Sequence, residues 1–345
     1  MVDVSNNSSK KGFFYIFLGI FFWSTIEIVY KLIQNEVDAL NANFWRMFFG
    51  GFVLLLYSAT LKNSKKALKD QNDIIKEGSK GFIFFIKRYY LYYINASLVG
   101  LVVGQIIYLQ GTKMTEAAYS ATIFSANPII LSLLTIIFFK ENKNLIKILG
   151  IIIGFIGVVF VITDFQFNNF FNSANIIGNF LVFIGMSLWC IDVFLGKAIM
   201  NKAEKDNVVS GYESEYFNAV TFILAAMIML PFIIRLEGFD KMLNYSAGAW
   251  LGLIYLGVVT GGIGYVLFFK GINMMEVSKG INIFYFKPII ASILSYFIFP
   301  SVHLKISLFL GILIEMLSLI MVSNNGSSKR SESLDDSSRK KIRES

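Results

Sequence analysis

The sequence predicts an all-α polytopic membrane protein of ten transmembrane helices, arranged as two inverted five-helix repeats with both termini in the cytoplasm. Three observations lead to this prediction. Of 345 residues, 55% are hydrophobic and 16% are charged, whereas soluble domains carry about 25% charged residues. Apolar runs recur from residue 13 to residue 322. A segment of the first half also recurs in the second half.

Each apolar run has about 20 residues, the length at which a helix crosses a bilayer. The ten spans are expected near residues 12–33, 41–61, 90–110, 116–139, 144–163, 176–199, 214–234, 247–269, 277–299 and 304–323. The chain therefore divides into five-span repeats at 1–164 and 165–323. The remaining segment, 324–345, is rich in serine and charged residues, a composition typical of a disordered tail.

Lysine and arginine residues predict the orientation, because they collect on the cytoplasmic side of a membrane protein. If ten spans alternate, one side receives 24 basic residues and the other receives only Lys113, Arg235, Lys241 and Lys305. Both termini lie on the basic side. These basic loops also predict contact with anionic lipid rather than with nucleic acid.

Residues 104–132 recur as residues 264–292, shifted by 160 positions. Gly104, Gly111, Met114, Glu116 and Pro128 return as Gly264, Gly271, Met274, Glu276 and Pro288. Because five spans per half is an odd number, the second repeat must be inverted relative to the first. Inverted repeats are typical of secondary transporters, whose binding site lies at the midplane between the halves.

Charged residues inside spans are costly and therefore mark candidate functional positions. Lys287 is expected near the midplane, directly before the helix-breaking Pro288, and Glu315 lies at a matching depth in the next span. Lys287 is interpreted as a ligand for a substrate carboxylate or phosphate. Glu315 is interpreted as its resting partner or as a proton carrier. The alternative is a buried structural ion pair.

Two further charge pairs are expected near opposite ends of the bundle. Glu27 and Arg46 can pair between the first two spans, and Asp192 can pair with Lys197 in the sixth. Each pair is either a gate or a fixed structural contact. Uncharged residues expected to line the cavity, which needs a few polar groups among aromatic walls, are Trp23, Gln105, Tyr108, Asn127, Tyr265, Asn282 and Tyr285. Pro128 and Pro288 are expected to break their helices at this level.

Several short motifs resemble those of a known family. They are Phe22-Trp23-Ser24, Arg46, Asn127-Pro128-Ile129, Lys140-Glu141, the Gly150, Gly154 and Gly157 spacing, Leu188-Trp189-Cys190, Pro288 and Gly311. In this order they are similar to the EamA family of the drug/metabolite transporter superfamily. The resemblance covers about residues 12–323 and implies a ten-helix inverted-repeat carrier of small metabolites. Two departures are Ser301, at the repeat position of Glu141, and Lys287, at that of Asn127.

The sequence therefore predicts a secondary active transporter that moves a small polar or anionic metabolite by alternating access. A passive channel is the first alternative. A membrane-embedded enzyme is the second, although the single histidine, His303, and the single cysteine, Cys190, argue against an enzyme and a metal site. No cofactor is expected. The expected partners are the substrate and membrane lipids, a homodimer is compatible with the sequence, and the cell membrane is the default location.

Overall fold

The computed structural model describes residues 6–67, 78–138, 145–165, 174–205, 213–272, 274, 282–299 and 305–322. Within these ranges, eight helices are long and apolar enough to cross a membrane, and no strand occurs. Two shorter apolar helices follow, Phe286–Ile298 and Ile306–Val322. The expectation of an all-helical polytopic membrane protein is confirmed. The count of ten spans and the position of both termini stay predictions, and the tail lies outside the described residues.

The eight long spans contain several shorter elements because many of them are interrupted. The first half contains α1 (Asn6–Trp23), α2 (Ile26–Ile33), α3 (Ala39–Ala67), α4 (Gly78–Asn95), η1 (Ala96–Gly104), α5 (Gln105–Met114), α6 (Ala117–Ser125), α7 (Asn127–Phe138) and α8 (Leu145–Thr163). The second half contains α9 (Ala174–Lys205), α10 (Glu213–Leu236), α11 (Phe239–Leu243), α12 (Ala247–Ile254), η3 (Tyr255–Ile263), α13 (Gly264–Ile272), η4 (Asn282–Tyr285), α15 (Phe286–Ile298) and the last helix, Ile306–Val322.

Helix interruptions recur at repeat-equivalent places. The π-helix η1 precedes α5 in the first half, and the π-helix η3 precedes α13 in the second, each over nine residues. The pair α6 and α7 is divided just before Pro128, and the 3-10 helix η4 gives way to α15 just before Pro288. A π-helix leaves backbone groups with altered partners and is frequent at functional sites.

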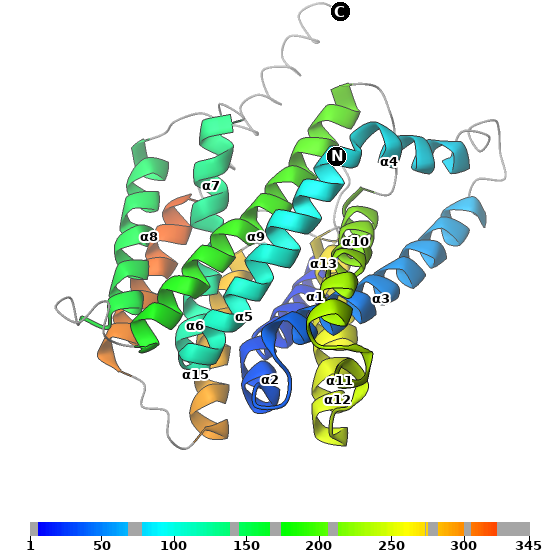
Figure 1. The fold of residues 1–345 in the computed structure, drawn as a ribbon. Coiled ribbons are helices and arrows are strands. Elements are labelled where there is room, and N and C mark those ends of the chain that lie inside the picture. Colours follow the sequence, from blue (N-terminus) through cyan, green and yellow to red (C-terminus); the bar gives the residue numbers. More distant parts are fainter. Residues whose placement is uncertain are drawn as a thin grey trace, which may run out of the picture.

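Helices from opposite halves pack through equivalent glycines. In Figure 1, α9 runs beside η1 and α5, and α1 lies near α13, as their contacts require. A Cβ added at Gly19 of α1 would lie 2.9 Å from the Gly264 carbonyl oxygen of α13. One added at Gly185 of α9 would lie 2.6 Å from the Gly104 carbonyl oxygen of η1. Only glycine allows the backbones to approach this closely.

Replacing Gly185 by valine is expected to lower the melting temperature of the detergent-purified protein strongly. The new Cβ would meet the Tyr108 backbone nitrogen at 2.5 Å, so α9 and α5 would have to separate, and overpacking costs about 1–3 kcal/mol or more. Gly248→Val is the control, because a Cβ there meets only the Ser246 hydroxyl, at 3.8 Å. Equal melting temperatures for the two variants would contradict this packing.

Candidate functional site

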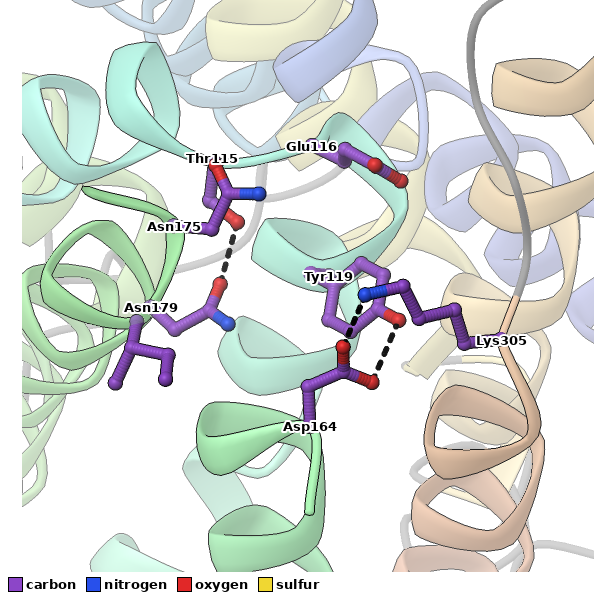
Figure 2. A pocket seen from close by; sticks show the side chains of 8 residues that line it. Thr115, Glu116, Tyr119, Asp164, Asn175, Asn179 and Lys305 are labelled. Carbon is purple, nitrogen blue, oxygen red and sulfur yellow. Dashed lines mark hydrogen bonds and ion pairs between the residues drawn. The ribbon is translucent and has the colours of Figure 1, made fainter. Parts of the chain in front are cut away.

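A polar cleft lies where α8 ends, between the start of α6, the start of α9 and Lys305 (Figure 2). Lys305 and Ser307 both bond the Asp164 carboxylate, and the Tyr119 hydroxyl lies 3.4 Å from it. The Thr115 hydroxyl donates to Asn179 at 2.6 Å. This cluster was not predicted from the sequence, because Asp164 and Lys305 lie near helix ends, where charged residues are ordinary.

The second polar region is buried in the bundle and begins at a break in the first span. The Ser24 hydroxyl donates to the Ile20 carbonyl at 2.8 Å, and the Thr25 hydroxyl donates to the Phe22 carbonyl at 2.7 Å. Such bonds back to the preceding turn compete with the helical ladder and bend a helix. The span therefore restarts as α2, and Glu27 lies in its first turn, fully buried.

Glu27 forms a buried ion pair with Lys287 of α15. The Lys287 Nζ lies 2.9 Å from Glu27 Oε1, and the same oxygen accepts a hydrogen bond from the Tyr108 hydroxyl at 2.6 Å. The Lys287 ammonium also lies 4.5 Å from the centre of the Phe124 ring, which attracts a cation through its negative face. Residues of both halves thus meet at one carboxylate.

Arg46 of α3 lies in the same region but does not pair with Glu27. Its Nη1 donates to the Gln105 amide oxygen of α5 at 2.7 Å, and both side chains are buried. Among the described residues, neither the expected Glu27–Arg46 pair nor the expected Lys287–Glu315 pair is present; Lys287 binds Glu27 instead. The direct hydrogen-bond partner of this buried guanidinium is therefore a neutral amide and not a carboxylate.

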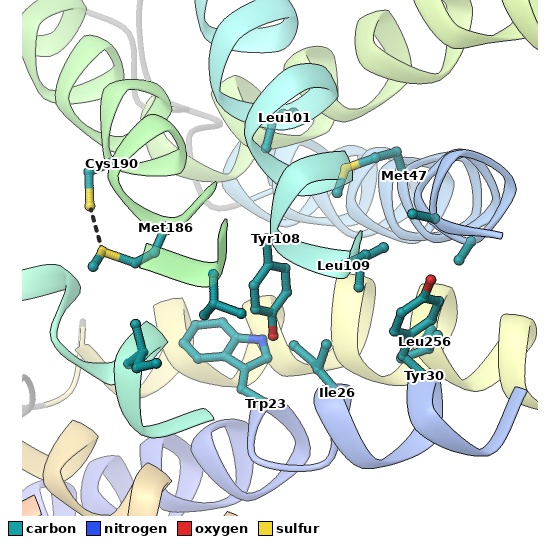
Figure 3. Close-up of a cluster of buried hydrophobic side chains, with 14 of the residues drawn as sticks. Trp23, Ile26, Tyr30, Met47, Leu101, Tyr108, Leu109, Met186, Cys190 and Leu256 are labelled. Carbon is teal, nitrogen blue, oxygen red and sulfur yellow. Dashed lines mark hydrogen bonds between the residues drawn. The ribbon is translucent and has the colours of Figure 1, made fainter. Parts of the chain in front are cut away.

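Several aromatic rings pack around Trp23. The Trp23 ring lies 4.9 Å from Tyr265, 5.1 Å from Phe268 and 5.5 Å from Phe284 between ring centres. Its indole nitrogen donates to the Thr260 carbonyl of η3 at 3.0 Å. Figure 3 shows Trp23 and Ile26 beside Tyr108, whose hydroxyl points toward them. The π-helix thus supplies a carbonyl that fixes the indole against the site.

Three buried polar atoms of this cluster have no hydrogen-bond partner within the described chain. They are Glu27 Oε2, Arg46 Nε and Gln105 Nε2. The first is an acceptor and the other two are donors. Because buried polar groups are nearly always bonded, the arrangement fits a polar ligand that accepts from Arg46 and Gln105 and donates to Glu27.

The other predicted residues are distributed over several places. Asp192 is buried on α9 against Gly100 of η1, and the ion pairs found among the described residues do not include the expected one with Lys197. Glu315 is buried on the last helix against Gly157 of α8.

The predicted residues at the two helix breaks differ in the contacts that the structure gives them. The Asn127 amide donates to the Phe124 carbonyl at 2.8 Å, so it closes the turn before Pro128. Pro288 is buried beside Lys287 in the first turn of α15. Asn282 and Tyr285 form the ends of η4, but their side chains lie outside the described residues.

This geometry can be compared with known proteins. A model of the EamA-like transporter family matches residues 10–163 and 176–324. The chain belongs to this family. The match covers two segments, one in each half of the sequence, and an EamA-like chain is a membrane transporter.

The curated EamA-like relatives are described as uncharacterized transporters. A Clostridium kluyveri protein is 21% identical over 94% of this chain and 96% of its own length, and one from Archaeoglobus fulgidus is 20% identical over 81% and 86%. YyaM of Bacillus subtilis is 22% identical over 67% and 72%. One solved crystal structure is 14% identical with a TM-score of 0.57, over 93% of this chain and 97% of that one, which supports the fold.

In this EamA-like chain, Tyr108→Phe is expected to lower the melting temperature of the purified protein. The substitution removes one of the two donors to Glu27 Oε1, and loss of a buried hydrogen bond to a charged group costs about 1–3 kcal/mol. Tyr90→Phe is the control, because Tyr90 is 52% exposed. A melting temperature unchanged in both variants would show that the Tyr108 hydroxyl does not stabilise the cluster.

Proposed function

We propose that the chain is a secondary carrier that moves a small polar or anionic metabolite across the cell membrane by alternating access. The observation that supports this most is the buried cluster of Glu27, Lys287, Tyr108, Arg46 and Gln105, to which both halves of the chain contribute. Intramembrane charges that face the bundle interior commonly mark a substrate or ion pathway.

The charges of the cluster favour a solute with an anionic group. Two cations, Lys287 and Arg46, face one directly bonded acid, Glu27. A carboxylate or phosphoryl group would supply a further negative charge and would accept from Arg46 Nε and Gln105 Nε2, which have no hydrogen-bond partner in the part of the chain that the structure describes. A donor on the same solute would satisfy Glu27 Oε2. The rings of Trp23 and Tyr265 would enclose its apolar part.

The same contacts suggest how solute binding is linked to movement. The Glu27–Lys287 pair joins α2 of the first half to α15 of the second. An anionic solute that takes Lys287 from Glu27 would remove this connection between the halves. Binding energy would then favour a second arrangement, as a ligand favours whichever conformation it binds better. The halves would rock past one another with the site alternately open to each side.

An inverted ten-helix arrangement is part of this proposal. It is supported by the glycine contact of Gly19 with Gly264 and its counterpart of Gly185 with Gly104, and by the paired π-helices η1 and η3. In each glycine contact, one helix comes from each half of the chain. A two-fold axis within the membrane plane would relate the two contacts.

The test is solute exchange in proteoliposomes. Vesicles containing the purified chain are loaded with a mixed metabolite extract, and isotope-labelled extract is added outside and followed by mass spectrometry. We expect one class of carboxylate- or phosphate-bearing solute to enter faster when the same solute is present inside. Such trans-stimulation requires a carrier whose binding site reorients across the membrane faster with solute bound than when it is empty.

A passive channel predicts a different result in the same vesicles. Flux through a channel would rise linearly with concentration, would not be stimulated from the opposite side and would produce a conductance. An enzyme would convert a solute without accumulating it. In the described residues no group of three or more His, Cys, Asp or Glu side chains could hold a metal ion. A metal-dependent enzyme would therefore need ligands outside this part of the chain.

A further inference from the structure

The last helix, Ile306–Val322, packs on α8 along a single stripe. Its residues at positions 307, 311, 315 and 318 are three or four apart and so share one face. Ser307 bonds Asp164 just beyond the end of α8, and Gly311 lies against Val161. The Ser318 hydroxyl donates to the Gly150 carbonyl at 2.7 Å. Glu315 lies between these contacts, where its Cγ would be 3.3 Å from a Cβ added at Gly157.

The Glu315 carboxyl has no polar partner in this interface. Its residue is 2% exposed, and both carboxylate oxygens lack a hydrogen-bond partner within the described chain. Among the described residues Glu315 makes no ion pair, and Asp164 and Lys305, at the end of the stripe, are paired with each other. This differs from Glu27, which has a lysine and a tyrosine at one oxygen.

An ionised carboxylate without a cation or a donor is very unfavourable inside a membrane protein, and such a group neutralises instead. Glu315 is therefore expected to hold its proton in this conformation. It lies eight residues beyond Ser307, which is about 12 Å along the helix. Ser307 bonds the Asp164 that lines the polar cleft of Figure 2. Separation of the two helices at that end would connect the carboxyl to the cleft.

We propose that Glu315 is the proton-coupling carboxyl of the transporter, at a place separate from the Glu27–Lys287 solute site. When α8 and the last helix part, the carboxyl gives its proton to water, leaving a carboxylate and a hydronium ion. In the other arrangement of the halves, the carboxyl takes up a proton from hydronium on the opposite side, so it is never open to both sides at once. Proton coupling rests on the proposed function, because solute movement drives the rearrangement. The protonation of Glu315 in the present conformation does not depend on the proposed function.

The first experiment compares wild type with Glu315→Gln in proteoliposomes under a pH gradient, with the mixed metabolite extract as the solute source. Wild type is expected to accumulate the solute above its outside concentration and to change the pH reported by entrapped pyranine. Glu315→Gln is expected to lose both effects while retaining solute exchange without a gradient, because glutamine mimics the protonated carboxyl. Asp240→Asn, at an exposed position of α11, is the control and should keep gradient-driven accumulation.

The outcomes separate coupling from other roles. Full accumulation by Glu315→Gln would overturn the proposal, and so would an equal loss of coupling in Asp240→Asn. Loss of exchange together with accumulation in a Glu315→Gln protein that remains monodisperse would also overturn it, by assigning Glu315 to solute binding or packing. Glu315→Asp, which keeps a titratable group, should recover part of the coupling.

A second readout needs no solute. Infrared difference spectra of purified wild type against Glu315→Gln should contain the carbonyl stretch of a protonated carboxyl at neutral pH. Its absence would overturn the proposal even if transport were observed. If the band is present but no solute moves in wild type, the proposed function fails and the proton-holding role of Glu315 stands.

Discussion

Lys287→Ala is expected to reduce solute exchange in proteoliposomes by about 30-fold or more, since removing one member of a buried bonded charge pair costs about 2–5 kcal/mol. The substitution takes away the cation that the solute anion would bind. It also leaves Glu27 buried with Tyr108 as its remaining bonded partner. Lys241→Ala is the control, because the Lys241 side chain is 65% exposed.

A double variant separates transport from folding. Lys287→Met combined with Glu27→Gln removes both charges, and replacing a buried ion pair by neutral groups is often nearly neutral for stability. We expect a melting temperature closer to wild type than that of Lys287→Ala, with exchange still lost. A double variant that exchanges solute at the wild-type rate would mean that the pair is purely structural.

Arg46→Gln is expected to raise the KM for anionic solutes by about tenfold or more, given that a hydrogen bond to a charged group contributes about 1.5–3 kcal/mol. In the structure the Arg46 guanidinium bonds only the neutral Gln105 oxygen among the described side chains, and its Nε has no partner. Its charge is therefore available to an anion. Exchange is measured as a function of outside solute concentration.

Arg46→Lys should lie between wild type and Arg46→Gln, because lysine keeps the charge but lacks the planar fork that binds two acceptor atoms at once. Arg235→Gln, at an exposed position in the last turn of α10, should have the wild-type KM. If Arg46→Gln also keeps the wild-type KM, Arg46 does not contact the solute, and the anionic character proposed for the substrate loses its main support.

The membrane fold and the family could be predicted from the sequence because they depend on features that a linear chain displays. Long apolar runs predicted helices close to those found, such as 247–269 against Ala247–Ile272. Short motifs in the same order in both halves predicted the EamA family, which the family match confirms. The Phe286–Ile298 helix differs most from its predicted range, 277–299, and its N-terminal side lies next to residues that the structure does not describe.

The pairing of the charges was predicted wrongly, although the residues themselves were identified. Glu27 was expected to pair with Arg46, and Glu315 was expected to be either the resting partner of Lys287 or a proton carrier, whereas the structure pairs Glu27 with Lys287. Depth along a straight helix does not say which face a residue occupies or which helix is its neighbour. The break at Ser24 and Thr25 also changes the course of the first span, and it contains neither glycine nor proline to reveal it. Glu27 and Lys287 are 260 positions apart, so local sequence patterns carry no signal of their contact.

The central claim is that the Glu27–Lys287 cluster is where the solute binds. The most direct measurement is equilibrium binding of the exchanged solute to detergent-purified wild type and to the Lys287→Met and Glu27→Gln double variant, both shown to be folded by their melting temperatures. The claim predicts saturable binding to wild type and binding weaker by about 30-fold or more in the double variant. Equal affinity in the two proteins would contradict it and would place the solute elsewhere in the bundle.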